Sequence, residues 1–147
     1  LTFMLGDEEY GIDILKVQEI RGFEKATEIP NSPEFVLGIM NLRGSVVPIV
    51  DLRKRFHLDH VEYNDITVVV LVKVENTVGS RTVGMVVDSV SEVYTVAEED
   101  IKPAPDIGGN IDLDFIHGLA TINEKMVILL DIDLLINAGV LADVNDD

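Results

Sequence analysis

The strongest constraint on the fold is an internal repeat. Residues 35–52 align without a gap on residues 115–132, and Phe, Gly, Val and Asp coincide at four of the 18 positions. Several further positions pair one apolar residue with another. A shorter match earlier in each half aligns residues 17–20 with residues 90–93. Because similar segments tend to fold alike and to bury their apolar faces against each other, the repeat predicts one domain built from two similar halves.

Each half consists of short apolar runs rich in Val and Ile, separated by Gly, Pro and Asn. This pattern favours strands over long helices, and many short strands with closely spaced turns are typical of a barrel or a sandwich. We expect strands at residues 1–5, 10–12, 17–21, 45–50, 66–75, 82–87, 91–96 and 125–131, and short helices around Ile14 and over residues 51–56 and 133–137.

The repeat also predicts the domain organisation. We expect a single domain over residues 1–137, with half-barrels of about 1–60 and 61–137, followed by a polar, acidic tail over residues 138–147. Halves of this size bury too little surface to be stable alone, so the interface between them should be apolar and exchange of strands between them is possible.

The charge excludes one class of partner. The chain carries 27 acidic and 11 basic side chains, a formal charge of −16, which repels the phosphates of nucleic acids and anionic lipids. Residues 1–60 have a net charge of −3 and residues 61–147 a net charge of −13. The cations of the first half gather at Arg43 and at residues 53–55, so a negatively charged partner, if there is one, should dock on this half.

Several kinds of chemistry are missing from the sequence. Without cysteine there is no disulfide, zinc–thiolate site or thiol nucleophile, and a reducing compartment is the natural location. The longest apolar run, residues 66–72, is far shorter than the ~20 residues of a membrane helix. No phosphate-binding glycine loop or nucleophile elbow follows a predicted strand.

Two histidines have the spacing of a metal site. His57 and His60 lie three residues apart, as on one face of a helix, and together with Asp59 they could bind a metal ion. The alternative is a solvated, polar helix end. We favour this alternative, because no further His or Cys is placed to complete four ligands, and we predict no metal site.

Asp131 and Asp133 could act as a general acid and base, but the repeat argues otherwise. Asp131 aligns with Asp51, which points to a shared structural task such as capping the next turn. His117 aligns with Leu37, so its position accepts an apolar side chain. We therefore predict no catalytic residue and no cofactor, and we do not expect an enzyme.

The turn at residues 41–44 leaves two interpretations open. It carries Arg43 where the second half has Asn123. The guanidinium could hold the turn by reaching a carboxylate or carbonyl groups of its own chain, or it could recognise a partner. The residues alone favour neither interpretation.

Residues 6–20, 38–44 and 47–52, followed in the second half by residues 83–93 and 129–132, closely resemble the CheW family of bacterial chemotaxis coupling proteins. The resemblance covers nearly all of residues 1–137. It implies a mainly β fold of two similar five-stranded SH3-like β-barrels packed around a shared apolar interface, with short helices.

The resemblance further implies a cytoplasmic adaptor that is not an enzyme. Members of the family bridge the cytoplasmic tips of transmembrane chemoreceptors to the histidine kinase CheA, whose regulatory domain has the same fold. They join receptor arrays at the inner membrane through these partners, without binding nucleic acid or lipid. The alternatives are the CheW-like part of a larger CheV-type protein with a receiver domain and, less favoured, a small metal-dependent hydrolase.

The family's binding positions, carried over residue by residue, form two sets that share one residue. The receptor-facing set, along the groove between the barrels, is Val17, Glu19, Gly38 and Arg43. The kinase-facing set on the first barrel is Ile14, Val17 and Ile20.

Overall fold

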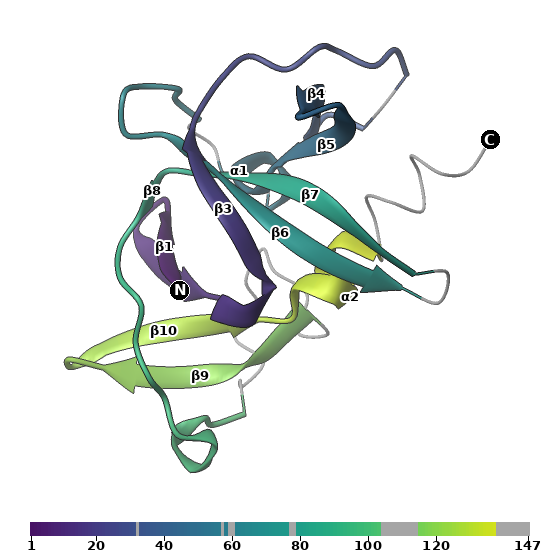
Figure 1. Cartoon of the computed structure of the whole chain (residues 1–147). Helices are drawn as coiled ribbons and strands as arrows, with labels where there is room; N and C mark the ends of the chain where they lie inside the picture. The colour runs from purple at the N-terminus through teal and green to yellow at the C-terminus, as the bar shows by residue number, and fades with distance from the viewer. Residues whose placement is uncertain (32, 57, 59–60, 77–78, 104–114, 138–147) are drawn as a thin grey trace.

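The chain folds into two five-stranded sheets with a few short helical turns (Figure 1). The computed structural model describes residues 1–31, 33–56, 58, 61–76, 79–103 and 115–137. The first sheet has the order β8 (Ser89–Val90), β1 (Thr2–Leu5), β2 (Glu8–Gly11), β10 (Lys125–Leu130), β9 (Ile116–Ile122). The second has the order β3 (Val17–Gly22), β6 (Val68–Asn76), β7 (Gly79–Val87), β5 (Ser45–Asp51), β4 (Val36–Leu42). The helical turns are η1 (Ile14–Lys16), α1 (Leu52–Arg55), η2 (Glu98–Asp100) and α2 (Ile132–Ile136).

Both sheets take strands from both halves of the sequence. The first combines β1 and β2 with β8, β9 and β10, and the second combines β3, β4 and β5 with β6 and β7. Two parallel pairings join the halves, β10 with β2 and β5 with β7. The halves therefore exchange strands, a possibility that the sequence left open, and neither sheet is formed by residues 1–60 or 61–137 alone. The expected tail, residues 138–147, lies outside the described residues.

The repeat is visible in the geometry of the β4–β5 and β9–β10 hairpins. Arg43 and Asn123 occupy the same turn position with the same positive φ of 51°. Asp51 caps α1 by accepting a hydrogen bond from the backbone N–H of Arg53, and Asp131 caps α2 in the same way through Leu134. The predicted capping role of both aspartates is confirmed.

Each hairpin also has an irregularity near its repeated glycine. The β4–β5 register shifts between Val36 and Gly38, and the β9–β10 register shifts between Leu129 and Leu130. Beside Gly38, an isolated bridge joins Thr27 to Ile39. Gly38 has a φ of +143°, and a Cβ atom there would overlap the carbonyl oxygen of Thr27. This glycine is thus required by the close approach of two backbones.

The structure differs from the predicted elements mainly in its strands. β4 and β9 were not predicted, because their glycines and polar residues weaken the alternating pattern and their pairing partners stabilise them instead. The strand predicted at residues 91–96 is absent, and only Ser89–Val90 pair with β1. The β6–β7 hairpin continues to a pairing of Asn76 with Gly79, so strand pairing extends beyond the predicted strands at residues 66–75 and 82–87.

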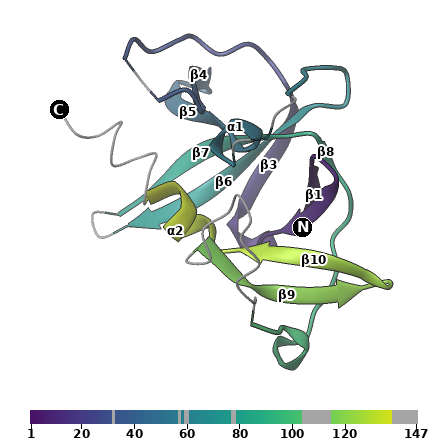
Figure 2. The same cartoon turned by 180° about the vertical axis from the view of Figure 1, so that it is seen from behind.

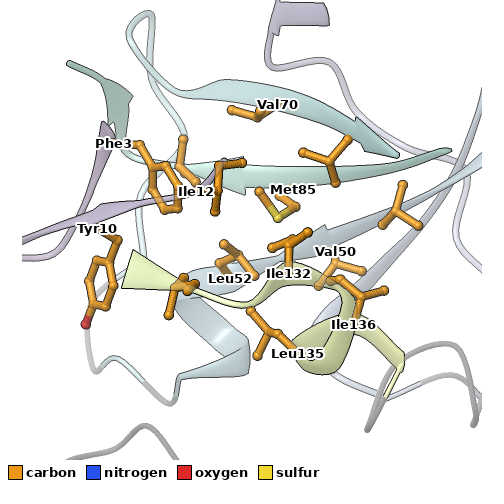
Figure 3. Close-up of a cluster of buried hydrophobic side chains, with 14 of the residues drawn as sticks. Phe3, Tyr10, Ile12, Val50, Leu52, Val70, Met85, Ile132, Leu135 and Ile136 are labelled. Atoms are coloured by element: carbon orange, nitrogen blue, oxygen red, sulfur yellow. The ribbon is translucent and has the colours of Figure 1, made fainter. Parts of the chain in front are cut away.

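One apolar core joins the two sheets (Figure 3). Phe3 and Tyr10 of the first sheet and Val70 and Met85 of the second belong to a single buried cluster, together with side chains from α1 and α2. A smaller cluster, centred on Leu71, packs on the opposite face of the second sheet. The interface between the sheets is therefore apolar, as marginal halves require.

A charged cluster is buried beside this core. Arg53 and Asp51 expose 1% and 0% of their side chains, and Arg53 donates to Asp51 through Nε (2.9 Å) and Nη2 (3.0 Å). Its Nη1 donates to Oδ1 of Asp88 at 2.8 Å. The other oxygen of Asp88 accepts the backbone N–H of Gly6 at 2.7 Å, and Tyr63 donates its hydroxyl to Asp51 at 2.6 Å. The cluster thus ties the β1–β2 turn of the first sheet to the second.

This arrangement corrects the prediction that the cations of residues 53–55 form a surface for a docking partner. Burial alone would lower the pKa of Arg53, but its hydrogen bonds to Asp51 and Asp88 outweigh burial and raise the pKa, so the guanidinium stays charged and these carboxylates balance its charge. The Arg55 guanidinium lies 5.3 Å from the ring centre of Phe35 and 5.2 Å from that of Phe115. Because its guanidinium is buried and paired, Arg53 is not available to a docking partner.

Replacing Arg53 with Met should lower the free energy of unfolding by about 3–5 kcal/mol, because it leaves the Asp51 carboxylate buried without its cation. Urea denaturation monitored by circular dichroism measures this loss. Lys54→Met, on the same short helix, is the matched control and should change stability by no more than about 0.5 kcal/mol. A loss below about 1 kcal/mol for Arg53→Met would contradict a stabilising role of the cluster.

Gly38→Ala should destabilise the fold by about 2 kcal/mol or more, because the added methyl group meets the Thr27 backbone at a φ that disfavours side chains. Gly22→Ala is the control: Gly22 also lies on a strand, and nothing lies within 4 Å of an added Cβ. Thermal unfolding of the two variants measures the difference. Equal melting temperatures would show that the close approach at Gly38 relaxes without cost.

Candidate functional site

Strand β3 carries most of the predicted binding residues, and a bulge divides them between its two faces. The register pairs Val17 with Val72 but then shifts, so that Ile20 pairs with Val70. Val72 and Val70 both belong to the core between the sheets. Glu19 is paired between these positions and lies on the opposite face of the strand. The bulge thus places Val17 and Ile20 on one face of β3 and Glu19 on the other.

Glu19 and Arg43 are brought together although 24 positions separate them. Arg43 Nη1 lies 3.2 Å from one Glu19 oxygen, and Arg21 Nη1 lies 3.1 Å from the other. The Arg43 side chain remains 71% exposed. The guanidinium therefore contacts a carboxylate of its own chain and still offers most of its surface to a partner, so the two interpretations of this turn are compatible.

A surface hollow adjoins Arg43. Its lining includes Gln18, Val46, Arg81 and Thr82. Gln18 and Thr82 are joined by a side-chain hydrogen bond of 2.7 Å, which links β3 to β7, and Val46 is 66% exposed. An apolar side chain beside a guanidinium is a suitable surface for a protein segment that carries both apolar and acidic groups.

Gly38 does not lie on this surface. It is buried on β4 against Thr27, where the bridge described above forms. The structure therefore brings together two of the four predicted receptor-facing residues, Glu19 and Arg43. Val17 lies on the other face of β3, and Gly38 is buried where β4 packs against Thr27.

The predicted kinase-facing residues lie along η1 and the core-facing side of β3. Ile14 and Ile20 are each 43% exposed, while Val17 is partly buried against the core. Ile14 also lines a cleft of about 490 Å³ between η1, the first sheet and α2. Leu15, at 87% exposure, is the most exposed large apolar side chain among the described residues. Sequence reasoning missed it, because the apolar residues around it, such as Ile12 and Val17, made burial of Leu15 equally plausible.

An ion pair links η1 to the end of the second half. Lys16 Nζ lies 2.9 Å from Oδ2 of Asp133 and 3.9 Å from Glu75. The hydrogen bond to Asp133 raises the pKa of Lys16. Asp133 also accepts the backbone N–H of Glu75 at 2.9 Å. Asp133 is thus engaged in contacts between elements, and the general acid–base interpretation has no support in this geometry.

The histidines are the remaining candidates for chemistry. His117 is exposed on β9, and within the part of the chain that the structure describes no group of three or more His, Cys, Asp or Glu side chains could hold a metal ion. His57, Asp59 and His60 lie outside the described residues. No helix among the described residues is long and apolar enough to span a membrane.

Comparisons with known proteins identify the family. A family model for the CheW-like domain matches residues 1–140. The chain is 46% identical to the chemotaxis protein CheW of Klebsiella aerogenes over 97% of this chain and 83% of that protein. It is 39% identical to the CheW of Rhizobium meliloti, covering 90% and 83% of the two chains.

A solved structure gives the same result. The scaffolding protein TtCheW of Thermoanaerobacter tengcongensis superposes with a TM-score of 0.81 at 35% identity, covering 91% of this chain and 84% of that one. The chemotaxis protein CheV3 of Helicobacter pylori is 27% identical over 87% of this chain but only 41% of its own length. The likeness to CheV-type proteins is thus weaker. With a domain match across its length and relatives above 30% identity, the chain belongs to the CheW family of chemotaxis proteins.

Proposed function

We propose that this chemotaxis coupling adaptor holds the cytoplasmic tips of transmembrane chemoreceptors and the histidine kinase CheA in one complex, by binding alone and without catalysis. The observation that carries the proposal is the bulge in β3, which separates Glu19 from Val17 and Ile20. One short strand thus offers a charged face and an apolar face. An adaptor needs two such surfaces, because both partners must bind at the same time.

The receptor would bind the charged face, around Arg43 and Glu19. A receptor tip is a helical hairpin, and a surface with apolar parts and one exposed guanidinium suits recognition of a helix. Val17 would contribute from the border with the apolar face. Gly38 would act indirectly, since the close approach of β4 to Thr27 sets the position of the β4–β5 turn that carries Arg43.

The kinase would bind the apolar face through Ile14, Val17 and Ile20. These side chains are partly exposed, and removing apolar surface from water is the main driving force of such contacts. The regulatory domain of CheA, which shares the fold, is the proposed partner. This contact would place the adaptor in receptor arrays on the cytoplasmic side of the inner membrane, held there by its protein partners.

Each sheet would form an SH3-like barrel. The Thr27–Ile39 and Lys102–Leu119 bridges support this assignment, because each connects the outer strand of a sheet to a segment that follows the strand at the opposite edge. The two bridges involve repeat-equivalent residues, Ile39 and Leu119, so both barrels would close in the same manner.

The alternative proposal is the CheW-like module of a larger CheV-type protein with a receiver domain. The 27% identity to a CheV protein, of which this chain covers 41%, is the observation in its favour. The full-length reading frame decides between the two: a receiver domain next to this chain would establish the alternative. Both proposals share the surfaces described above.

Arg43→Ala should weaken binding to a receptor-tip fragment about tenfold and leave binding to the CheA regulatory domain unchanged, because it removes an exposed guanidinium from the charged face only. Surface plasmon resonance with each partner separately measures both affinities. Lys25→Ala, which removes another exposed cation of the first half, is the control. Unchanged receptor binding by the Arg43 variant would remove this residue from the receptor site.

Ile20→Glu should weaken binding to the CheA regulatory domain at least about tenfold, because it buries a carboxylate in an apolar contact, while receptor binding persists. Co-sedimentation of receptor tips with CheA should then recover less kinase. Ile66→Glu places the same charge on an apolar residue that is 64% exposed elsewhere and should recover as much kinase as the unmodified chain. Full recovery with both variants would exclude Ile20 from the kinase-facing surface.

A further inference from the structure

The segment that carries Ile14 has little to hold it in place by itself. η1 is a single 3-10 turn of three residues, and none of them is buried. Ile14 and Leu15 are 43% and 87% exposed, so core packing fixes neither side chain. Asp13 caps the turn through the backbone N–H of Leu15 at 2.9 Å. A turn this short gains few hydrogen bonds for the backbone freedom that it loses, so its position depends on contacts made outside it.

Lys16 makes that outside contact. Its ammonium lies 2.9 Å from Asp133, with the two side chains 24% and 29% exposed. Asp133 is itself held from two directions, because it lies in α2 and its other oxygen accepts the Glu75 N–H of β6. Asn137 donates to the Glu75 carbonyl at 2.7 Å, which fixes α2 against the same strand. Figure 2 shows α2 beside the β6–β7 hairpin.

The repeat shows that helix capping does not require the carboxylate of Asp133. Asp51 and Asp131 cap α1 and α2 at equivalent positions. Two positions after each capping aspartate, the two halves differ in charge. The first half has the buried Arg53, and the second half has Asp133, which pairs with Lys16. A carboxylate at this point is thus a feature of the second half alone, and its partner belongs to the turn that carries Ile14.

We propose that the Lys16–Asp133 contact positions η1 before the kinase binds, so that Ile14 and Leu15 are already presented in the geometry of the complex. This inference rests on the kinase-facing surface proposed above and adds Leu15 to it. Lys16 and Asp133 are positioning residues that act through η1. Ordering the turn in advance lowers the entropy lost on association, which strengthens binding without a new contact to the partner.

Lys16→Met keeps the aliphatic stem and removes the ammonium. If the correctly placed turn falls to about one tenth of the population, the apparent Kd for the isolated CheA regulatory domain rises about tenfold. Hydrogen exchange at the backbone amides of Leu15, Lys16 and Val17 should accelerate. The receptor-tip Kd and the melting temperature should stay unchanged, because a partly exposed ion pair adds little to global stability.

Three further variants sharpen the test. Asp133→Asn should behave like Lys16→Met, since its amide oxygen can still accept the Glu75 N–H. Lys16→Arg keeps the cation and should restore kinase binding. Lys73→Met removes an exposed lysine of β6 and should change no measurement.

Two results would overturn the inference. One is an unchanged kinase Kd in both Lys16→Met and Asp133→Asn. The other is an equal loss of kinase and receptor binding together with a lower melting temperature, which would make the contact purely structural. If the unmodified chain does not bind the kinase domain, the proposed function fails instead; unchanged amide exchange in Lys16→Met would then also overturn the positioning contact.

Discussion

The buried pairing of Arg53 with Asp51 and Asp88 is the interaction on which the arrangement of the two sheets depends. A guanidinium with 1% exposure is stable only where carboxylates and carbonyls satisfy it, and here they come from three separate stretches of chain. Asp51 ends β5, Asp88 follows β7 and also accepts from the β1–β2 turn, and the Glu62 carbonyl precedes β6. Apolar packing alone would tolerate small slips between the sheets. The directional hydrogen bonds that run from Arg53 through Asp88 to the backbone of Gly6 oppose such slips.

The two halves use one framework for different purposes. Both have a bulged hairpin, a repeated glycine and a capping aspartate. At matching places the first half has Arg43 and Arg53 where the second has Asn123 and Asp133. One of these arginines is exposed at a candidate binding surface, and the other is buried, with its charge balanced by carboxylates. The difference in net charge between the halves therefore does not by itself identify a docking surface.

Much of the fold follows from the sequence, because repetition and alternation are local properties. The capping aspartates, the mainly β class and most strands could be predicted in this way. The strands β4 and β9 could not, since pairing with a neighbouring strand, and not their own pattern, stabilises them. The burial of Arg53 could not be predicted either. It depends on a contact with Asp88, 35 positions away, and the local sequence does not indicate that these two residues meet. The same applies to the site, where the bulge in β3 decides which side chains share a face.

The exchange of strands between the halves has a consequence for cooperativity. If the chain were cut between the halves, neither piece would retain a whole sheet: one would lack β6 and β7, and the other β1 and β2. Each piece would expose unpaired strand edges and one side of the common core. We therefore expect the molecule to unfold as one unit in spite of its internal repeat. A force applied to either sheet is therefore passed to the other through the covalent connections between their strands.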